Sequence, residues 1–156
     1  MRAFAGLPNP AGWAEEAGKG DMTRTAHCCC GALRVEVSSE PTFVAACHCE
    51  QCQRRTGSAF GISAYFPAGQ IRIAGSSKVF CRESDAGQAV EMHFCPECGT
   101  SVYWEAAFMP GHIGIAAGTF SDPAFPPPTI SAWERSKHPW ISFTGTTLHL
   151  REQTAP

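Results

Sequence analysis

Seven of the nine cysteines in this chain have spacings that are typical of metal ligands. The sharpest signal is Phe-Cys-Pro-Glu-Cys-Gly-Thr at residues 94–100, which contains Cys95 and Cys98. Its proline presets the first turn, and its glycine supplies the positive φ that lets backbone N–H groups point at the sulfurs, as in zinc ribbons. Cys28 and Cys30 offer a second pair, so these four thiols predict one tetrahedral zinc site that stabilises the fold. A redox-active dithiol and plain buried thiols are the alternatives.

A second cluster, Cys-His-Cys-Glu-Gln-Cys at residues 47–52, supplies three thiols: Cys47, Cys49 and Cys52. Structural zinc sites use four protein ligands, whereas catalytic sites use three and leave the fourth position for water or substrate. An open position beside three thiolates suits a soft sulfur ligand, so the cluster predicts a second, catalytic zinc ion and a thiol substrate. The alternative is a closed site, with the fourth ligand among Cys29, His48, Cys81 and His93.

Charged and polar residues flank this second cluster. Arg54 and Arg55 follow it directly, and their guanidinium groups would suit the carboxylates of a thiol substrate. Solvated surface arginines are the alternative. His48 lies between two ligand cysteines, so its ring is expected to point away from the metal and to pack or to support the ligands. A hydrolytic zinc enzyme would need a base near the metal, and Glu50 is the one local carboxylate that could serve as one.

The elements that must position these residues are short strands. Apolar and polar side chains alternate in residues 33–37, 71–73, 90–94, 113–115 and 148–150. Residues 50–55 predict a single helical turn, which Thr56 and Gly57 end. Residues 123–128, rich in proline, predict an extended surface segment. The sequence therefore predicts a mostly β fold with little helix.

The expected organisation is a poorly ordered leader at residues 1–21, rich in Gly, Ala, Pro and Glu, followed by one zinc-binding β domain at residues 22–156. Cys81 shares a strand face with Val79 and is expected to be a buried apolar thiol. Most of the core is expected to come from eight aromatic residues: Phe60, Tyr65, Phe66, Phe94, Tyr103, Trp104, Trp133 and Trp140.

Composition narrows the class of protein. The chain has 156 residues, a net charge of −2 and a pI near 6.3, without the basic stripe expected of a nucleic-acid-binding domain. No apolar run approaches the length of about 20 residues that a membrane helix needs, and the N-terminal residues lack the apolar stretch of a signal peptide. We therefore expect a cytoplasmic protein with reduced thiols and with neither nucleic acid nor membrane as a partner.

Three motifs occur in a fixed order: Cys-x-Cys-Gly, Cys-His-Cys-x-x-Cys-x-Arg, and Phe-Cys-x-x-Cys-Gly-Thr. In this order they resemble the glutathione-dependent formaldehyde-activating enzyme family, which includes centromere-protein-V-like members. Ala-Trp-Glu-Arg-Ser-Lys-His-Pro-Trp at residues 132–140 looks like the C-terminal segment of that family. The resemblance covers about residues 25–145. It implies coiled antiparallel β-sheets with two zinc ions, a structural one on Cys28, Cys30, Cys95 and Cys98 and a catalytic one on Cys47, Cys49 and Cys52.

The resemblance also implies an activity. It is that of a carbon–sulfur lyase of formaldehyde detoxification, with glutathione and an aldehyde as partners and S-hydroxymethylglutathione as product. The competing hypothesis is a non-catalytic zinc β module that binds a small thiol or a protein. A chromatin or cytoskeletal role, as in the centromeric relatives, would require a basic tail, which this chain lacks.

Overall fold

The structure is a computed structural model that describes residues 23–152. The predicted leader, residues 1–21, lies outside the described residues. The described strands are β1 (Arg24–His27), β2 (Arg34–Val37), β3 (Phe43–Cys47), β4 (Gly61–Pro67), β5 (Ile71–Ala74), β6 (Lys78–Glu83), β7 (Ala89–Phe94), β8 (Ser101–Ala106), β9 (His112–Ala116), β10 (Ile130–Ala132) and β11 (Leu148–Leu150). One α-helix, α1 (Glu50–Thr56), and three 3-10 turns, η1 (Ala68–Gln70), η2 (Ala117–Phe120) and η3 (Glu134–Ser136), complete this part of the chain. The mostly β prediction is confirmed, and so is the short helix after the cysteine triplet.

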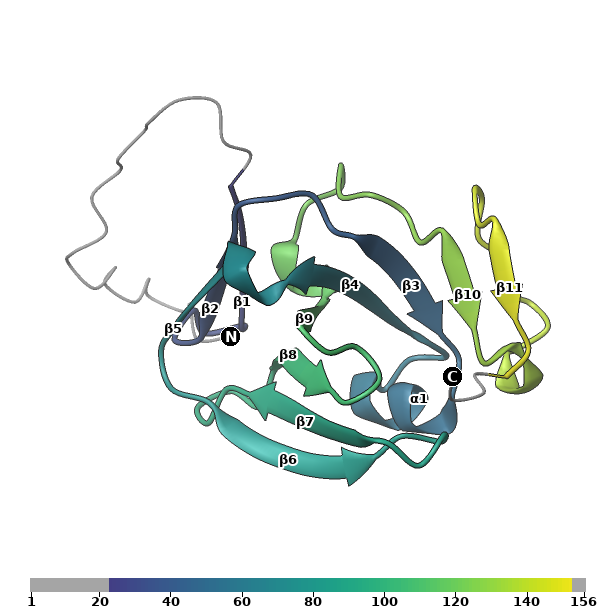
Figure 1. Ribbon diagram of the computed structural model, residues 1–156, viewed down its shortest axis with the longest axis horizontal. Coiled ribbons are helices and arrows are strands. Elements are labelled where there is room, and N and C mark those ends of the chain that lie inside the picture. The colour runs from purple at the N-terminus through teal and green to yellow at the C-terminus, as the bar shows by residue number, and fades with distance from the viewer. Residues whose placement is uncertain (1–22, 153–156) are drawn as a thin grey trace, which may run out of the picture.

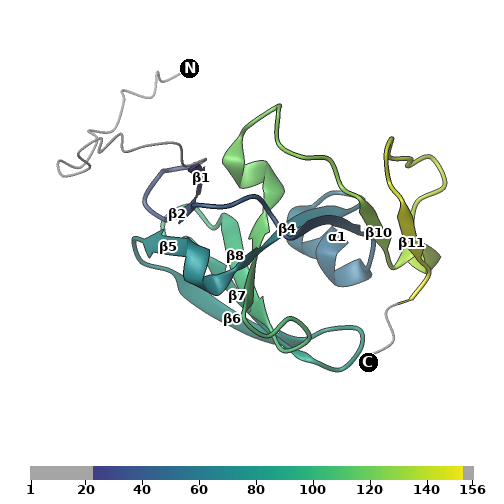
Figure 2. The same cartoon turned by 45° about the horizontal axis from the view of Figure 1, so that its top comes forward.

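The strands form a small and a large sheet. The small sheet has the order β1-β2-β5, and the large one has the order β11-β10-β3-β4-β9-β8-β7-β6. Figure 1 shows the small sheet at one end of the molecule and α1, β10 and β11 toward the other, and the rotated view in Figure 2 shows the same separation. None of the helices among residues 23–152 has the length and apolarity needed to cross a membrane.

The main core lies between the two sheets. Val35 and Val37 of β2 are fully buried, as their alternation with Arg34 and Glu36 predicts. They pack in one cluster with residues of the large sheet, among them Val44, Phe66, Val102 and Ile115. This packing holds the small sheet and the β7–β8 end of the large sheet together, and the first cysteine cluster lies there.

Most strand pairs are antiparallel, but β10 is an exception. It runs parallel to both of its neighbours, β3 and β11. The cause is the long connection between β9 and β10, which consists of η2 and residues 121–129. It brings the chain back beside β3, so that β10 runs in the same direction as β3. The prolines of residues 123–128 lie in this connection and outside every strand, as predicted.

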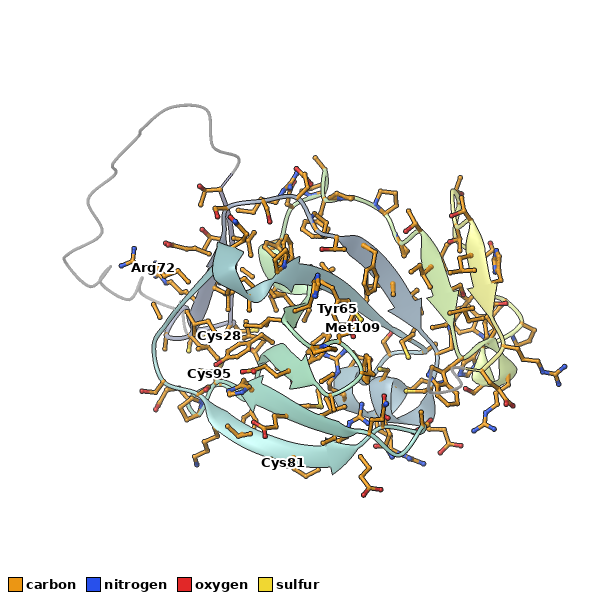
Figure 3. All side chains as sticks on the ribbon, viewed as in Figure 1. Cys28, Tyr65, Arg72, Cys81, Cys95 and Met109 are labelled. Carbon is orange, nitrogen blue, oxygen red and sulfur yellow. The ribbon has the colours of Figure 1, made fainter. Side chains whose placement is uncertain are left out.

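Two predictions about burial were wrong. Cys81 is exposed, because β6 is an edge strand whose outer face nothing covers; Figure 3 shows the side chain at the rim of the sheet. Trp140 is 72% exposed, and its ring lies beside that of His138 in the segment between η3 and β11. Of the eight aromatic residues expected in the core, five are buried: Tyr65, Phe66, Tyr103, Trp104 and Trp133.

Candidate active site and metal centre

Four cysteines from two distant turns meet at one end of the molecule. Cys28 and Cys30 belong to the β1–β2 turn, Cys95 and Cys98 to the β7–β8 turn, and all four sulfurs lie within 4.8 Å of one another. Figure 3 shows Cys28 and Cys95 close together. The Cys28–Cys30 and Cys30–Cys95 sulfur distances are 3.5 and 3.6 Å. A zinc–sulfur bond of about 2.3 Å in tetrahedral geometry requires sulfurs about 3.8 Å apart, so this cluster fits a zinc ion.

The backbone of both turns prepares these sulfurs for a metal. Gly99, with φ of 74°, donates its N–H to the Cys95 carbonyl at 2.9 Å, and the Leu33 N–H donates to the Cys28 sulfur at 3.2 Å. Hydrogen bonds from the hydroxyl and the backbone of Thr100 lower the pKa of Cys98 to about 5. The positive φ predicted for the glycine of the knuckle is present.

The second cluster is built by the end of β3 and the start of α1. Cys47 ends the strand, Cys49 caps the helix and Cys52 lies in its first turn. The Cys52 N–H donates to the Cys49 sulfur at 3.4 Å, and the three sulfurs lie within 4.8 Å of one another. Hydrogen bonds from the Cys47 and Cys49 thiols hold the pKa of Cys52 well below its usual range, and two nearby guanidinium groups, of Arg55 and Arg82, lower it further. The donor set fits a metal with three protein ligands.

The four residues considered as a further ligand do not join this cluster. Within residues 23–152, no further Cys, His, Asp or Glu ligand atom belongs to the group formed by the sulfurs of Cys47, Cys49 and Cys52. Cys29 and Cys81 are exposed elsewhere. The His48 ring lies against Ser131, with Nε2 and Oγ 3.1 Å apart, and His93 lies against Ser77, with Nδ1 and Oγ 3.0 Å apart.

A cavity of about 230 Å³ opens on the three-cysteine cluster. Its walls come from β3, α1, β4, the β6–β7 hairpin, β8 with the loop after it, and the C-terminal segment, so that the three cysteines face a partly enclosed space. The polar side chains in the wall are Arg55, Ser63, Tyr65, Arg82, Ser84, Asp85 and Gln88. The apolar wall includes Phe43, Val90, Met92, Trp104, Phe108, Met109 and Trp133.

Arg55 contacts an aromatic ring in this wall. Its guanidinium carbon lies 4.6 Å from the centre of the Trp104 ring. A Cβ on Gly61 would lie 2.7 Å from Arg55 Nη2, and a Cβ on Gly114 would collide with the Trp104 indole nitrogen. Gly114 therefore gives the Trp104 ring its space, whereas the atom near Gly61 is the flexible end of the Arg55 side chain. The contact with the Trp104 ring places the Arg55 guanidinium in the wall beside the cluster.

The two predicted arginines have different surroundings. Arg54 lies outside this cavity and pairs with Glu50 at 2.7 Å, with both side chains about two-thirds exposed. It lines a separate depression on the other side of Arg55 and Arg82. Arg82 was missed by sequence reasoning, because only the pairing of β6 with β7 shows which face it lies on. It pairs with buried Val90, so the face of β6 that carries Arg82 points inward and the face that carries Cys81 points outward.

One protein-family model matches most of the described chain. The model of a family described as glutathione-dependent formaldehyde-activating enzyme matches residues 23–136, which include all seven clustered cysteines. The chain belongs to this family. A crystal structure of a Rhodobacter sphaeroides protein is 22% identical, with a TM-score of 0.49, over 61% of this chain and 85% of that one. No curated protein matches the chain.

The family segment ends with residues that support the cysteine loop. In this formaldehyde-activating enzyme homologue, Ser131 on β10 donates to Glu134 at 2.6 Å and therefore accepts from the fully buried His48 ring. The Ser136 hydroxyl donates to the His48 carbonyl at 2.9 Å. The predicted supporting role of His48 is thus a link between the loop of the second cluster and the C-terminal segment.

Glu134 gives this homologue a predicted pH dependence. Hydrogen bonds from Ser131, and then from His149 and Lys137, lower the pKa of Glu134 to about 2. Because the folded-state pKa is below the ordinary value of 4.5, the stabilisation is complete above pH 4.5 and is lost as the pH falls toward 2. We expect Glu134→Gln to lower the free energy of unfolding by about 1 kcal/mol at pH 7, with a shrinking difference below pH 4.5.

Denaturant unfolding between pH 7 and pH 2.5 measures this difference. Glu152→Gln is the control, because its 3.5 Å pair with Arg135 is exposed and surface pairs contribute little. If the difference in free energy of unfolding between wild type and Glu134→Gln stays constant down to pH 2.5, the stabilisation does not come from the charged form of Glu134.

Proposed function

We propose that this protein is a zinc-dependent carbon–sulfur lyase that catalyses the reversible addition of glutathione to formaldehyde, giving S-hydroxymethylglutathione. The observation that carries the proposal is the opening of the three-cysteine cluster onto a cavity lined by two guanidinium groups, Arg55 and Arg82. A purely structural zinc site has no need of such a space. Membership of the formaldehyde-activating enzyme family supports the choice of thiol and aldehyde.

The residues around the cluster suit a thiol that carries carboxylates. Arg55 and Arg82 offer planar donors to a carboxylate, and both line the cavity. Asp85 lies exposed at the rim, on the hairpin after β6, where it suits the ammonium group of the same substrate. A zinc ion held by Cys47, Cys49 and Cys52 would supply a Lewis acid that favours the thiolate form of the substrate.

The reaction then needs two bond changes. The substrate thiolate forms a carbon–sulfur bond to the carbonyl carbon, and the π electron pair moves to the oxygen, which takes a proton. The reverse sequence releases thiol and formaldehyde. Binding of both reactants in the cavity beside the three cysteines would turn a reaction between two molecules into one within a single complex.

Exchange NMR of ¹³C-formaldehyde with glutathione tests this proposal. The expected result is a rate of formation and breakdown of the adduct that rises in proportion to the concentration of zinc-loaded protein. Binding of glutathione without any increase in exchange rate would contradict the proposal and favour the non-catalytic module.

A substitution series tests how the substrate is bound. Arg82→Gln is expected to raise KM for glutathione about tenfold with little change in kcat, because a carboxylate contact present throughout the reaction is lost. Arg54→Gln is expected to have a smaller effect, because Arg54 lies outside the cavity. Arg72→Gln on β5, at the opposite end of the molecule in Figure 3, is the control. A KM for Arg82→Gln equal to that of Arg72→Gln would contradict the assignment.

A further inference from the structure

We propose that Tyr65 is the proton donor of the addition step: its phenol protonates the oxygen of the aldehyde as the carbon–sulfur bond forms. The inference rests on the proposed function and adds a catalytic residue to it. It starts from the position of Tyr65 on β4, where the side chain is 7% exposed and lines the same cavity as the three cysteines. Figure 3 shows Tyr65 near the centre of the molecule, close to Met109, another wall residue.

The phenol of Tyr65 is oriented by one hydrogen bond and one ring contact. The Trp104 indole N–H donates to the Tyr65 oxygen at 3.4 Å. Because an indole nitrogen is only a donor, this bond occupies a lone pair and leaves the phenol hydrogen for a second partner. Phe43 stacks on the Tyr65 ring at 4.7 Å. The oxygen is thus fixed while its hydrogen remains available for donation.

The orienting indole is itself fixed. Gly114 on β9 provides the space for the Trp104 ring, and Arg55 stacks on it at 4.6 Å. Trp104 therefore contacts both Arg55, which would bind a substrate carboxylate, and Tyr65, which would donate the proton. Such a rigid arrangement places donors without reorganisation during the reaction.

The electrostatic surroundings keep the proton on the phenol until it is needed. Burial raises the pKa of Tyr65 to about 12, although the hydrogen bond from Trp104 acts in the opposite direction. The phenol is therefore neutral near pH 7. It is still more acidic than an aliphatic alcohol, so transfer to a newly formed alkoxide is favourable.

The other polar groups in the cavity wall are less suited to this step. Arginines do not release a proton in proteins, and serine hydroxyls are weaker acids than a phenol. Asp85 is exposed at the rim. Tyr65 combines burial, orientation and a transferable proton.

The step balances without a further reagent. The thiolate electron pair forms the carbon–sulfur bond, the carbonyl π pair becomes a lone pair on oxygen, and the phenol proton moves to that oxygen. Tyrosinate then regains a proton from water. In the reverse direction, tyrosinate removes the hydroxyl proton while the carbon–sulfur bond breaks.

Tyr65→Phe tests the inference, with Tyr103→Phe as a matched control. These are the two tyrosines of the chain, and Tyr103 is also buried but stacks on His93 at 4.2 Å and is not in the cavity wall. We expect Tyr65→Phe to lower kcat for exchange about 10²-fold with KM unchanged. Zinc content by native mass spectrometry and glutathione affinity by calorimetry should stay at the wild-type values. Tyr103→Phe should keep kcat.

The outcomes separate the two proposals. Unchanged kcat in Tyr65→Phe, with an active wild type, overturns the role of Tyr65 and leaves the lyase function standing. Loss of zinc or of glutathione affinity in Tyr65→Phe overturns it too, because the phenol would then be part of the binding structure. A wild type that binds glutathione but does not accelerate exchange overturns both.

Discussion

Cys98→Ser is expected to leave this protein without a stable fold at physiological temperature. Its thermal melt should therefore show no cooperative unfolding transition. The four-cysteine cluster closes a large loop, since Cys30 and Cys95 are 65 residues apart. Binding of a structural zinc ion contributes on the order of 10 kcal/mol in small domains, which is comparable with the whole stability of a typical domain. Loss of one ligand also leaves the buried Cys28 and Cys95 without their metal.

Circular dichroism melts combined with zinc analysis measure this effect. Cys29→Ser is the matched control, because Cys29 lies in the same turn but its side chain is exposed and outside the cluster. A Cys98→Ser protein with the melting temperature of Cys29→Ser would refute a structural role for this site.

Cys52→Ser is expected to give a folded protein without activity. Cys52 lies in a short helix with no fully buried residue and packs against the small cluster of Cys49, Ala132 and Trp133, not against the main core, so its loss removes little packing. It removes one of the three thiols that would hold the second zinc ion. We expect exchange to fall to the uncatalysed rate, glutathione binding to disappear, and the melting temperature to change by only a few degrees.

Native mass spectrometry, exchange NMR and thermal melts on one sample test this set of expectations. Cys81→Ser is the control for general effects of losing a thiol, because Cys81 is exposed on β6 and belongs to neither cluster. Equal losses of stability in Cys98→Ser and Cys52→Ser would refute the division into a structural and a catalytic zinc site.

The residues that were predictable are those whose chemistry depends on local spacing. The motifs around Cys95 and Cys47 predicted both clusters, and the structure brings both together. Alternation predicted the buried Val35 and Val37. The short helix was predictable because Gly57, with φ of 63°, ends it.

What sequence reasoning missed depends on contacts between distant segments. Both faces of β6 carry apolar and charged residues, so the sequence of this strand does not tell the inner face from the outer one. Only its pairing with β7 shows that Arg82 points inward and Cys81 outward. The parallel direction of β10 depends on the path of the connection after η2. The Tyr65–Trp104 contact joins β4 and β8, strands that are not adjacent in the sheet.

The late position of β10 and β11 in the chain has a consequence for synthesis on the ribosome. All four cysteines of the first cluster are present once Cys98 has emerged, so a nascent chain already has every thiol that would bind a metal ion there. The cavity is different, because Trp133 and Leu150 form part of its wall. A growing chain therefore carries the three thiols from residue 52 onward, and the wall of the cavity around them is complete only after Leu150 has been added.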